Sequence, residues 1–170
     1  MHDSIANASN GRTRLTVCLS ISLLLLMLGG WLTSLGMGQW YQELELPPFQ
    51  PPAWIFTPAW ITLLTMLAVA TWIITCKNGR ESPMTMSIAL LLYGLQLALN
   101  AGWSLLFFAV QRPDFALGEI IALDAVLLGM IFVYGRISKT AGLLLVPYFL
   151  WLLFATAINA WIVINNEAFA

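Results

Sequence analysis

The sequence predicts an all-α membrane protein: a bundle of five transmembrane helices with a proline-rich outer loop between the first and second helices. Of its 170 residues, 60% are hydrophobic and only 9% are charged. A soluble chain is about one quarter charged, because its surface faces water. The apolar residues also gather into five stretches, each close to the ~20 residues needed to cross the hydrocarbon core of a bilayer. Together the two observations exclude a soluble domain.

The five stretches organise the chain into one membrane domain, residues 15–166, between a polar N-terminal tail, residues 1–14, and a C-terminal tail, residues 167–170. The expected helices cover about 15–38, 58–75, 84–110, 115–134 and 142–164. The first run is longer than the ~7 to 15 residue core of a secretory signal, so we expect it to be retained. The runs lack the alternation of a barrel strand, and a spanning helix satisfies its own backbone hydrogen bonds.

Basic residues predict the orientation, because Lys and Arg near span ends are retained on the cytoplasmic side. The expected inner ends carry Arg12, Arg14, Lys77, Arg80, Arg136 and Lys139. The outer side carries Arg112 as its basic residue, together with Glu43, Glu45 and Glu167. We therefore expect the N-terminus inside and the C-terminus outside, with the bacterial cytoplasmic membrane as the default location.

Composition and motifs argue against several functional classes. Seven Lys and Arg residues against eight Asp and Glu leave no basic surface for nucleic acid. A metal site is not predicted, because the chain has one histidine, His2, and its two cysteines, Cys18 and Cys76, lack the spacing of metal ligands. We interpret the cysteines as packing residues. The chain lacks a glycine-rich phosphate loop and a Ser-His-Asp set, so conventional hydrolysis and kinase chemistry are disfavoured, and no cofactor is expected to be required.

The first loop, residues 40–60, holds five of the eight prolines. Proline fixes φ and donates no hydrogen bond, so this segment is expected to form a stiff lid, with Pro58 opening the second span. An alternative explains its tryptophans as an aromatic belt, since Trp and Tyr gather at bilayer interfaces in many membrane proteins. That alternative suits Trp40 and Trp72 well.

The third span presents two different faces. Gln96, Asn100 and Trp103 share one face, which should point into the bundle because polar groups are costly in lipid. The nearly opposite face carries the small residues Gly94, Ala98 and Gly102, whose spacing permits close helix contact and predicts a dimer interface. Equally open is an interpretation in which Gln96 and Asn100 only join helices.

Other polar and aromatic residues fall at similar depth. The fifth span carries Pro147, Trp151, Ala155 and Asn159 four residues apart, and a flat ligand could stack on Trp151 beside Ala155. The fourth span carries Glu119 and, on a different face, Asp124; intramembrane carboxylates suggest function. A mostly apolar pocket is therefore predicted in the outer half, with Trp151 as its floor. Its remaining members are Trp60, Asn100, Trp103, Phe115, Glu119, Ala155 and Asn159.

Three blocks of this sequence resemble the translocator protein family, also called TspO, the tryptophan-rich sensory proteins or the peripheral benzodiazepine receptors. The first is W-Y…L-P-P-F-Q-P-P-A-W-I-F-T-P-A-W over residues 40–60. The second is Q-L-A-L-N-A-G-W over residues 96–103, followed by Phe107 and Phe108. The third is V-P-Y-F-L-W-L-L-F-A-T-A-I-N over residues 146–159. Three such blocks in order are far more specific than any one of them.

The resemblance implies a five-helix bundle that often dimerises, with a pocket beneath the first loop for porphyrins, sterols and isoquinoline or benzodiazepine ligands. Departures from the family pattern include Leu46 where Lys is common and Leu64 where Tyr is common. Residues 159–165 also lack the Tyr and the Lys or Arg of the family's sterol motif, so sterol recognition is not expected there. By resemblance the pocket is lined by Trp60, Asn100, Phe115, Trp151, Ala155 and Ile158, with Tyr41 and Trp54 contributed by the loop.

The function expected from this resemblance is a membrane receptor or carrier for tetrapyrroles such as protoporphyrin IX or a haem-like molecule, acting as a homodimer. Two alternatives stay open. The first is an enzyme that degrades bound porphyrin in light, using Trp60 and Trp151. The second is a membrane scaffold whose polar residues serve helix packing and which binds no ligand.

Overall fold

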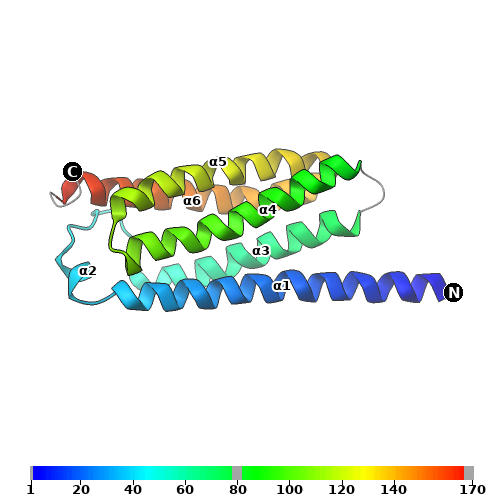
Figure 1. Cartoon of the computed structure of the whole chain (residues 1–170), viewed down its shortest axis with the longest axis horizontal. Helices are drawn as coiled ribbons and strands as arrows, with labels where there is room; N and C mark the ends of the chain where they lie inside the picture. Colours follow the sequence, from blue (N-terminus) through cyan, green and yellow to red (C-terminus); the bar gives the residue numbers. More distant parts are fainter. Residues whose placement is uncertain (1, 78–81, 167–170) are drawn as a thin grey trace.

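The computed structural model describes residues 2–77 and 82–166, with the backbone alone for residues 2–9. The regular elements of these residues are helices, and five of them are long and apolar enough to cross a membrane (Figure 1). The all-α, five-helix prediction is therefore confirmed. Three features named from the sequence lie outside the described residues: Arg80, Glu167 and the tail of residues 167–170. The His2 side chain lies outside them as well.

The transmembrane helices are α1 (His2–Gly36), α3 (Phe56–Cys76), α4 (Pro83–Ser104), α5 (Pro113–Ile137) and α6 (Lys139–Asn165). Three short elements accompany them: α2 (Gln39–Glu43), the 3-10 turn η1 (Ala53–Ile55) and the π-helical turn η2 (Leu105–Ala109) that continues α4. In space α1 packs beside α3, α3 beside α6, α6 beside α5 and α5 beside α4, and η2 returns to α1. The N-terminal end of α1 and the C-terminal end of α6 lie at opposite ends of the bundle (Figure 1).

Helix α1 begins earlier than expected, at His2 rather than near residue 15. Contacts with the end of α3 support this polar extension: the Trp72 indole Nε1 donates a hydrogen bond to the Gly11 carbonyl (2.9 Å), and the Arg14 guanidinium donates to the Thr75 carbonyl. Carbonyls at a helix C-terminus lack partners within the helix, so a cation at that position is favourable. Cys18 is buried as predicted for a packing residue, but Cys76 is exposed, because it lies at the free end of α3.

Two close approaches bring the helices together through glycine. A Cβ added to Gly36 of α1 would lie 2.4 Å from the Phe108 carbonyl oxygen in η2, and one on Gly142 of α6 would lie 2.8 Å from the Gly135 Cα in α5. Side chains at either position would collide with backbone, which cannot give way. These contacts hold α1 against η2 at one end and α6 against α5 at the other.

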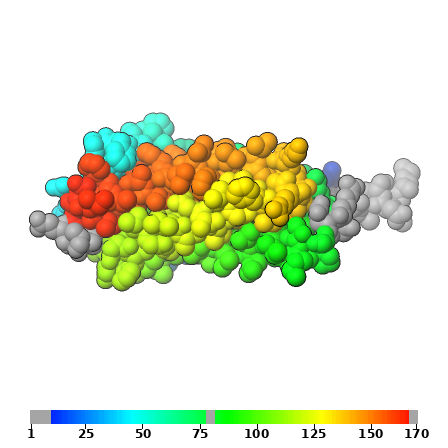
Figure 2. Space-filling model, turned by 90° about the horizontal axis from the view of Figure 1, so that it is seen from above, coloured from blue at the N-terminus to red at the C-terminus, as the bar shows by residue number. Residues whose placement is uncertain are grey.

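The outer loop is tied to α6. The Asn166 side chain makes two hydrogen bonds with the backbone of Glu45, accepting from its N–H (2.9 Å) and donating to its carbonyl (3.1 Å). The Phe49 ring packs on Phe154 and Trp161, with centroids 6.2 and 5.8 Å apart. In the space-filling view the loop lies against the C-terminal part of α6 (Figure 2). The loop is therefore fastened to the C-terminal part of α6, and its role as a lid stays a prediction.

Candidate ligand-binding site

Tyr148 of α6 lies at the centre of the polar residues in the bundle. It is fully buried, and its hydroxyl accepts hydrogen bonds from Gln96 Nε2 (2.7 Å) and Asn100 Nδ2 (2.8 Å) of α4. The Trp60 ring of α3 meets the Tyr148 ring edge-on, with centroids 6.0 Å apart. Our sequence analysis missed Tyr148, although it shares the inward face of α6 with Leu152 and Asn159, at spacings of four and seven residues.

Trp103 and Asn159 form a second polar contact nearby. The Trp103 indole donates to Asn159 Oδ1 (3.0 Å), and Asn159 Nδ2 donates to the Pro113 carbonyl (2.8 Å), where α5 begins. Gln96, Asn100 and Trp103 therefore share a face of α4 that points into the bundle, as predicted. Asn159, which is fully buried, joins three helices. These amides join neighbouring helices, as one of the two interpretations predicted. The residues proposed to bind a ligand are therefore the same residues that connect the helices.

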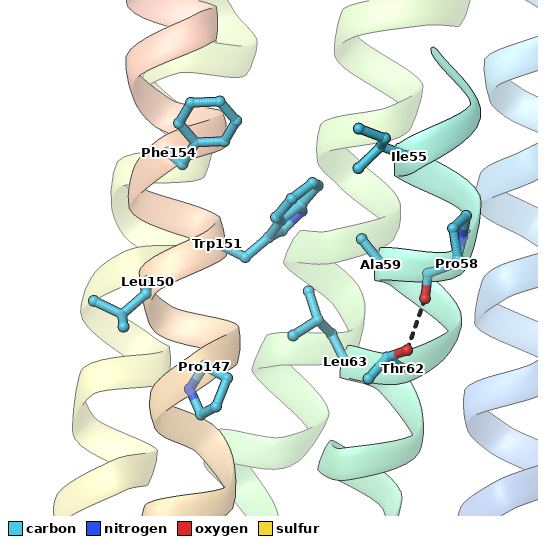
Figure 3. Close-up of a pocket in the computed structure, with 9 residues that line it drawn as sticks. All are labelled: Ile55, Pro58, Ala59, Thr62, Leu63, Pro147, Leu150, Trp151 and Phe154. Carbon is cyan, nitrogen blue, oxygen red and sulfur yellow. Dashed lines mark hydrogen bonds between the residues drawn. The ribbon is translucent and has the colours of Figure 1, made fainter. Parts of the chain in front are cut away.

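Trp151 of α6 occupies a different position, in the gap between α6 and α3. Its ring packs on Phe56 and Phe154, with centroids 5.8 and 5.9 Å apart, and its buried indole N–H has no hydrogen-bonding partner among the residues that the structure describes. It lies beside an open groove of about 620 Å³ (Figure 3). The groove is lined by Ile55, Pro58, Ala59, Thr62, Leu63, Pro147, Leu150, Trp151 and Phe154. Of the residues predicted to line a pocket, these nine include Trp151 alone.

The predicted stripe on α6 does not form a single surface. Pro147 and Trp151 line the groove, whereas Asn159 points into the bundle. Four residues turn a helix by about 400°, so each step of four rotates the side chain about 40° further. Ala155 is partly buried against the main core, and the buried Ile158 packs with Phe107 and Phe108. The two therefore belong to the interior rather than to the groove.

Beyond Asp114 in its first turn, α5 carries two carboxylates, Glu119 and Asp124, and they face different helices. Both Glu119 oxygens are buried, and no described residue forms a hydrogen bond with them. A Cβ on Gly102 of α4 would lie 3.3 Å from Glu119 Oε1. Asp124 accepts a hydrogen bond from Thr156 of α6 (2.8 Å). Within residues 2–77 and 82–166, neither carboxylate pairs with a cation. An unpaired carboxylate in a transmembrane helix is costly and is a candidate for function.

Two predicted site residues, Trp54 and Phe115, lie away from the interior, and a third, Tyr41, packs at its edge. Trp54 is 73% exposed on the outer turn η1, as the aromatic belt alternative requires. Phe115 is 57% exposed, with the Arg112 guanidinium 4.0 Å from its ring centroid, because Ala116 is the inward residue of that turn. A hydrogen bond to Asp114 raises the pKa of this guanidinium. Tyr41 packs on Phe108 and accepts a hydrogen bond from Gln50 (3.1 Å), so it serves the fold of the loop.

The three small residues predicted to form a dimer interface do not share one exposed surface. Gly94 and Ala98 are exposed on the outside of α4, where a second copy could reach them. Gly102 differs, because its Cα faces the Glu119 carboxyl group of the same chain. Its small size therefore serves contact between α4 and α5, and dimerisation through Gly94 and Ala98 stays a prediction.

Comparison with known proteins agrees with this architecture. The TspO/MBR family profile matches residues 17–164. The chain is 40% identical over 139 residues to the tryptophan-rich protein TspO of Archaeoglobus fulgidus, covering 81% of this chain and 87% of the relative. It is 34% identical to the translocator protein of Sus scrofa, over 82% and 85% of the two chains. It is 30% identical to the tryptophan-rich sensory protein of Cereibacter sphaeroides, over 71% of this chain and 73% of the relative. The chain belongs to the TspO/MBR family.

Proposed function

We propose that this protein binds flat, apolar molecules dissolved in the membrane, with tetrapyrroles such as protoporphyrin IX as the leading class, and acts as their receptor or carrier. The observation that carries the proposal is the position of Trp151. Its indole lies between an apolar groove and the aromatic interior, and no group in the described part of the chain accepts a hydrogen bond from its buried N–H. A flat ligand can stack on such a ring, and one acceptor atom of the ligand can satisfy the N–H.

The surrounding residues support the same proposal. Trp60 and Trp103 belong to other spans, and both contact residues of α6 within three turns of Trp151. The Gln96 and Asn100 amides are held in place by Tyr148, and the Asn159 amide by Trp103 and the Pro113 carbonyl, so they present a fixed set of polar groups to a ligand. We place the ligand between Trp151 and Trp60, with Glu119 and Asn100 as the polar groups that orient it.

We also propose the location. The basic residues Arg12, Arg14, Lys77, Arg136 and Lys139 lie toward the end of the bundle where α1 begins, and Arg112 lies at the other end. By the positive-inside tendency this places the N-terminus in the cytoplasm and the outer loop outside. The bacterial cytoplasmic membrane is the proposed site, with the homodimer as the working unit.

The test is a titration with protoporphyrin IX of the purified protein in detergent, in darkness, followed by porphyrin absorbance and by thermal stabilisation. A ligand that binds the folded state raises its stability by mass action. Replacing Trp60 and Trp151 together by Ala should raise Kd about 100-fold, equivalent to about 2.7 kcal/mol. The matched control replaces Trp31 and Trp54, which are 59% and 73% exposed, and should leave Kd unchanged.

Other outcomes separate the alternatives. Equal loss of affinity in both double variants would reject the Trp60 and Trp151 site, and no saturable binding by the native protein would favour the scaffold. Illumination then tests catalysis. Porphyrin loss faster with the native protein than with the Trp60→Ala, Trp151→Ala variant would identify the light-dependent enzyme.

A further inference from the structure

We propose that the ligand enters this protein sideways from the bilayer, through the groove between α3 and α6, and that the groove is its first binding site. The inference rests on the proposed function. Beyond the proposed function, it names the route of entry and the class of ligand that this route admits, which is an apolar molecule already dissolved in the membrane.

The groove lies between two transmembrane helices. One wall is the outer part of α3, with Pro58, Ala59 and Thr62, and the other is α6, with Pro147 and Leu150. Both helices are among those long and apolar enough to span the membrane. Figure 3 shows the Trp151 ring reaching across the gap from α6 toward α3, between the groove's two walls. The open side of the groove therefore faces hydrocarbon.

The lining offers an entering molecule almost no polar contact. Its single side-chain hydroxyl, on Thr62, donates to the Pro58 carbonyl of its own helix (2.8 Å). Pro58 and Pro147 carry no backbone N–H. Polar groups stripped of water and left unpaired are costly, so this surface admits the apolar ring system of a ligand, and any carboxylates that the ligand carries must stay at the membrane surface. It accepts an apolar molecule, for which the Trp151 N–H is the first donor at the inner limit of the groove.

The route from the aqueous side is closed by the loop. The Glu45 backbone is bound through both its N–H and its carbonyl to Asn166, and Phe49 is held between Phe154 and Trp161. A ligand that enters beneath the loop from water must break the hydrogen bonds and the ring contacts between the loop and α6 together. Entry from the side requires movement of Trp151, whose ring makes edge and tilted contacts with Phe56 and Phe154. Entry between α3 and α6 therefore breaks fewer contacts than entry beneath the loop.

The experiment measures how fast protoporphyrin in lipid nanodiscs quenches tryptophan fluorescence after mixing, in three versions of the full chain. Ala59→Phe narrows the groove; Ala122→Phe adds the same ring to the exposed outside of α5 as a matched control. The third version carries Glu45→Cys and Asn166→Cys, with Cys18→Ala and Cys76→Ser, so that oxidation locks the loop to α6. Thr62→Phe, on the exposed side of the groove, repeats the first test if Ala59→Phe does not fold.

We expect Ala59→Phe to slow both quenching and its reversal about tenfold, with little change in Kd, because a narrowed path raises the barrier in both directions. Ala122→Phe and the oxidised loop should match the native rate. If the oxidised loop slows binding and its reduction restores the rate, entry is from above and the inference fails. If the groove variants bind at the native rate, the groove holds lipid chains alone, and the inference fails too. Absence of saturable quenching in the native protein would instead contradict the proposed function.

Discussion

Replacing Gly36 by Ala is expected to destabilise the protein by about 3 kcal/mol, the upper end of the cost of overpacking. The added Cβ would lie 2.4 Å from the Phe108 carbonyl oxygen and 2.8 Å from the Phe108 Cα. Both atoms belong to the backbone, so α1 must move away from η2 as a whole. That movement also disturbs Phe107 and Phe108, on which Trp40 and Tyr41 of the loop pack.

The measurement is the midpoint of unfolding in a denaturing detergent, followed by circular dichroism. Gly30→Ala supplies the control, because Gly30 lies in the same helix and an added Cβ there has no atom within 4 Å. Alanine is the better helix former, so Gly30→Ala should be neutral or slightly stabilising. Equal midpoints for the two variants would contradict the close approach of α1 to η2.

Replacing Tyr148 by Phe is expected to cost about 1 to 3 kcal/mol, because two buried amide donors lose their acceptor at once. Hydrogen bonds between transmembrane helices contribute about 0.6 kcal/mol on average and about 1.7 at most, and here two end on one oxygen. The Tyr148 hydroxyl accepts from Gln96 and Asn100. The same variant should weaken porphyrin binding, since both amides lose their fixed orientation.

Tyr93→Phe is the matched control for this prediction. Tyr93 is also a buried tyrosine, 7% exposed, but no amide of the described residues donates to its hydroxyl, which faces Ser22 alone among the hydrogen-bonding side chains. Unfolding in detergent should therefore distinguish the two variants, with Tyr93→Phe close to the native midpoint. A larger loss in Tyr93→Phe than in Tyr148→Phe would show that the amides of α4 do not depend on α6.

The sequence predicted the fold because the bilayer imposes length and hydropathy on each span separately. Every expected transmembrane helix exists. The observed ends differ from the expected ones mainly where contacts with water or with a neighbouring helix determine how far the helix extends. The N-terminal extension of α1 is such a case, since its polar residues give no apolar signal and are held by Trp72 and Arg14. The π-helical turn η2 was also not predicted, because residues 105–109 are apolar in either helical form.

The candidate site was predicted less completely, because pairing between helices is not visible in one helix at a time. Periodicity placed Gln96, Asn100 and Trp103 on one inward face, and the structure agrees. It could not identify Tyr148 as their partner, nor Asn166 as the partner of Glu45, 121 residues away. The sequence also could not show that Trp54 and Phe115 are exposed, because an aromatic residue near a span end suits the interface and the interior equally well.

Pro147 lies inside α6 and marks the position at which this helix bends most easily. A proline inside a helix leaves the carbonyl four residues earlier, that of Leu143, without its backbone donor and favours a bend there. Gly142, just below, is pressed against Gly135, which anchors the inner segment to α5. Tyr148, Trp151 and Asn159 all lie above. Bending at this point would move these three residues and the α6 wall of the groove as one unit. The width of the groove between α3 and α6 and the orientation of the polar side chains would then change together.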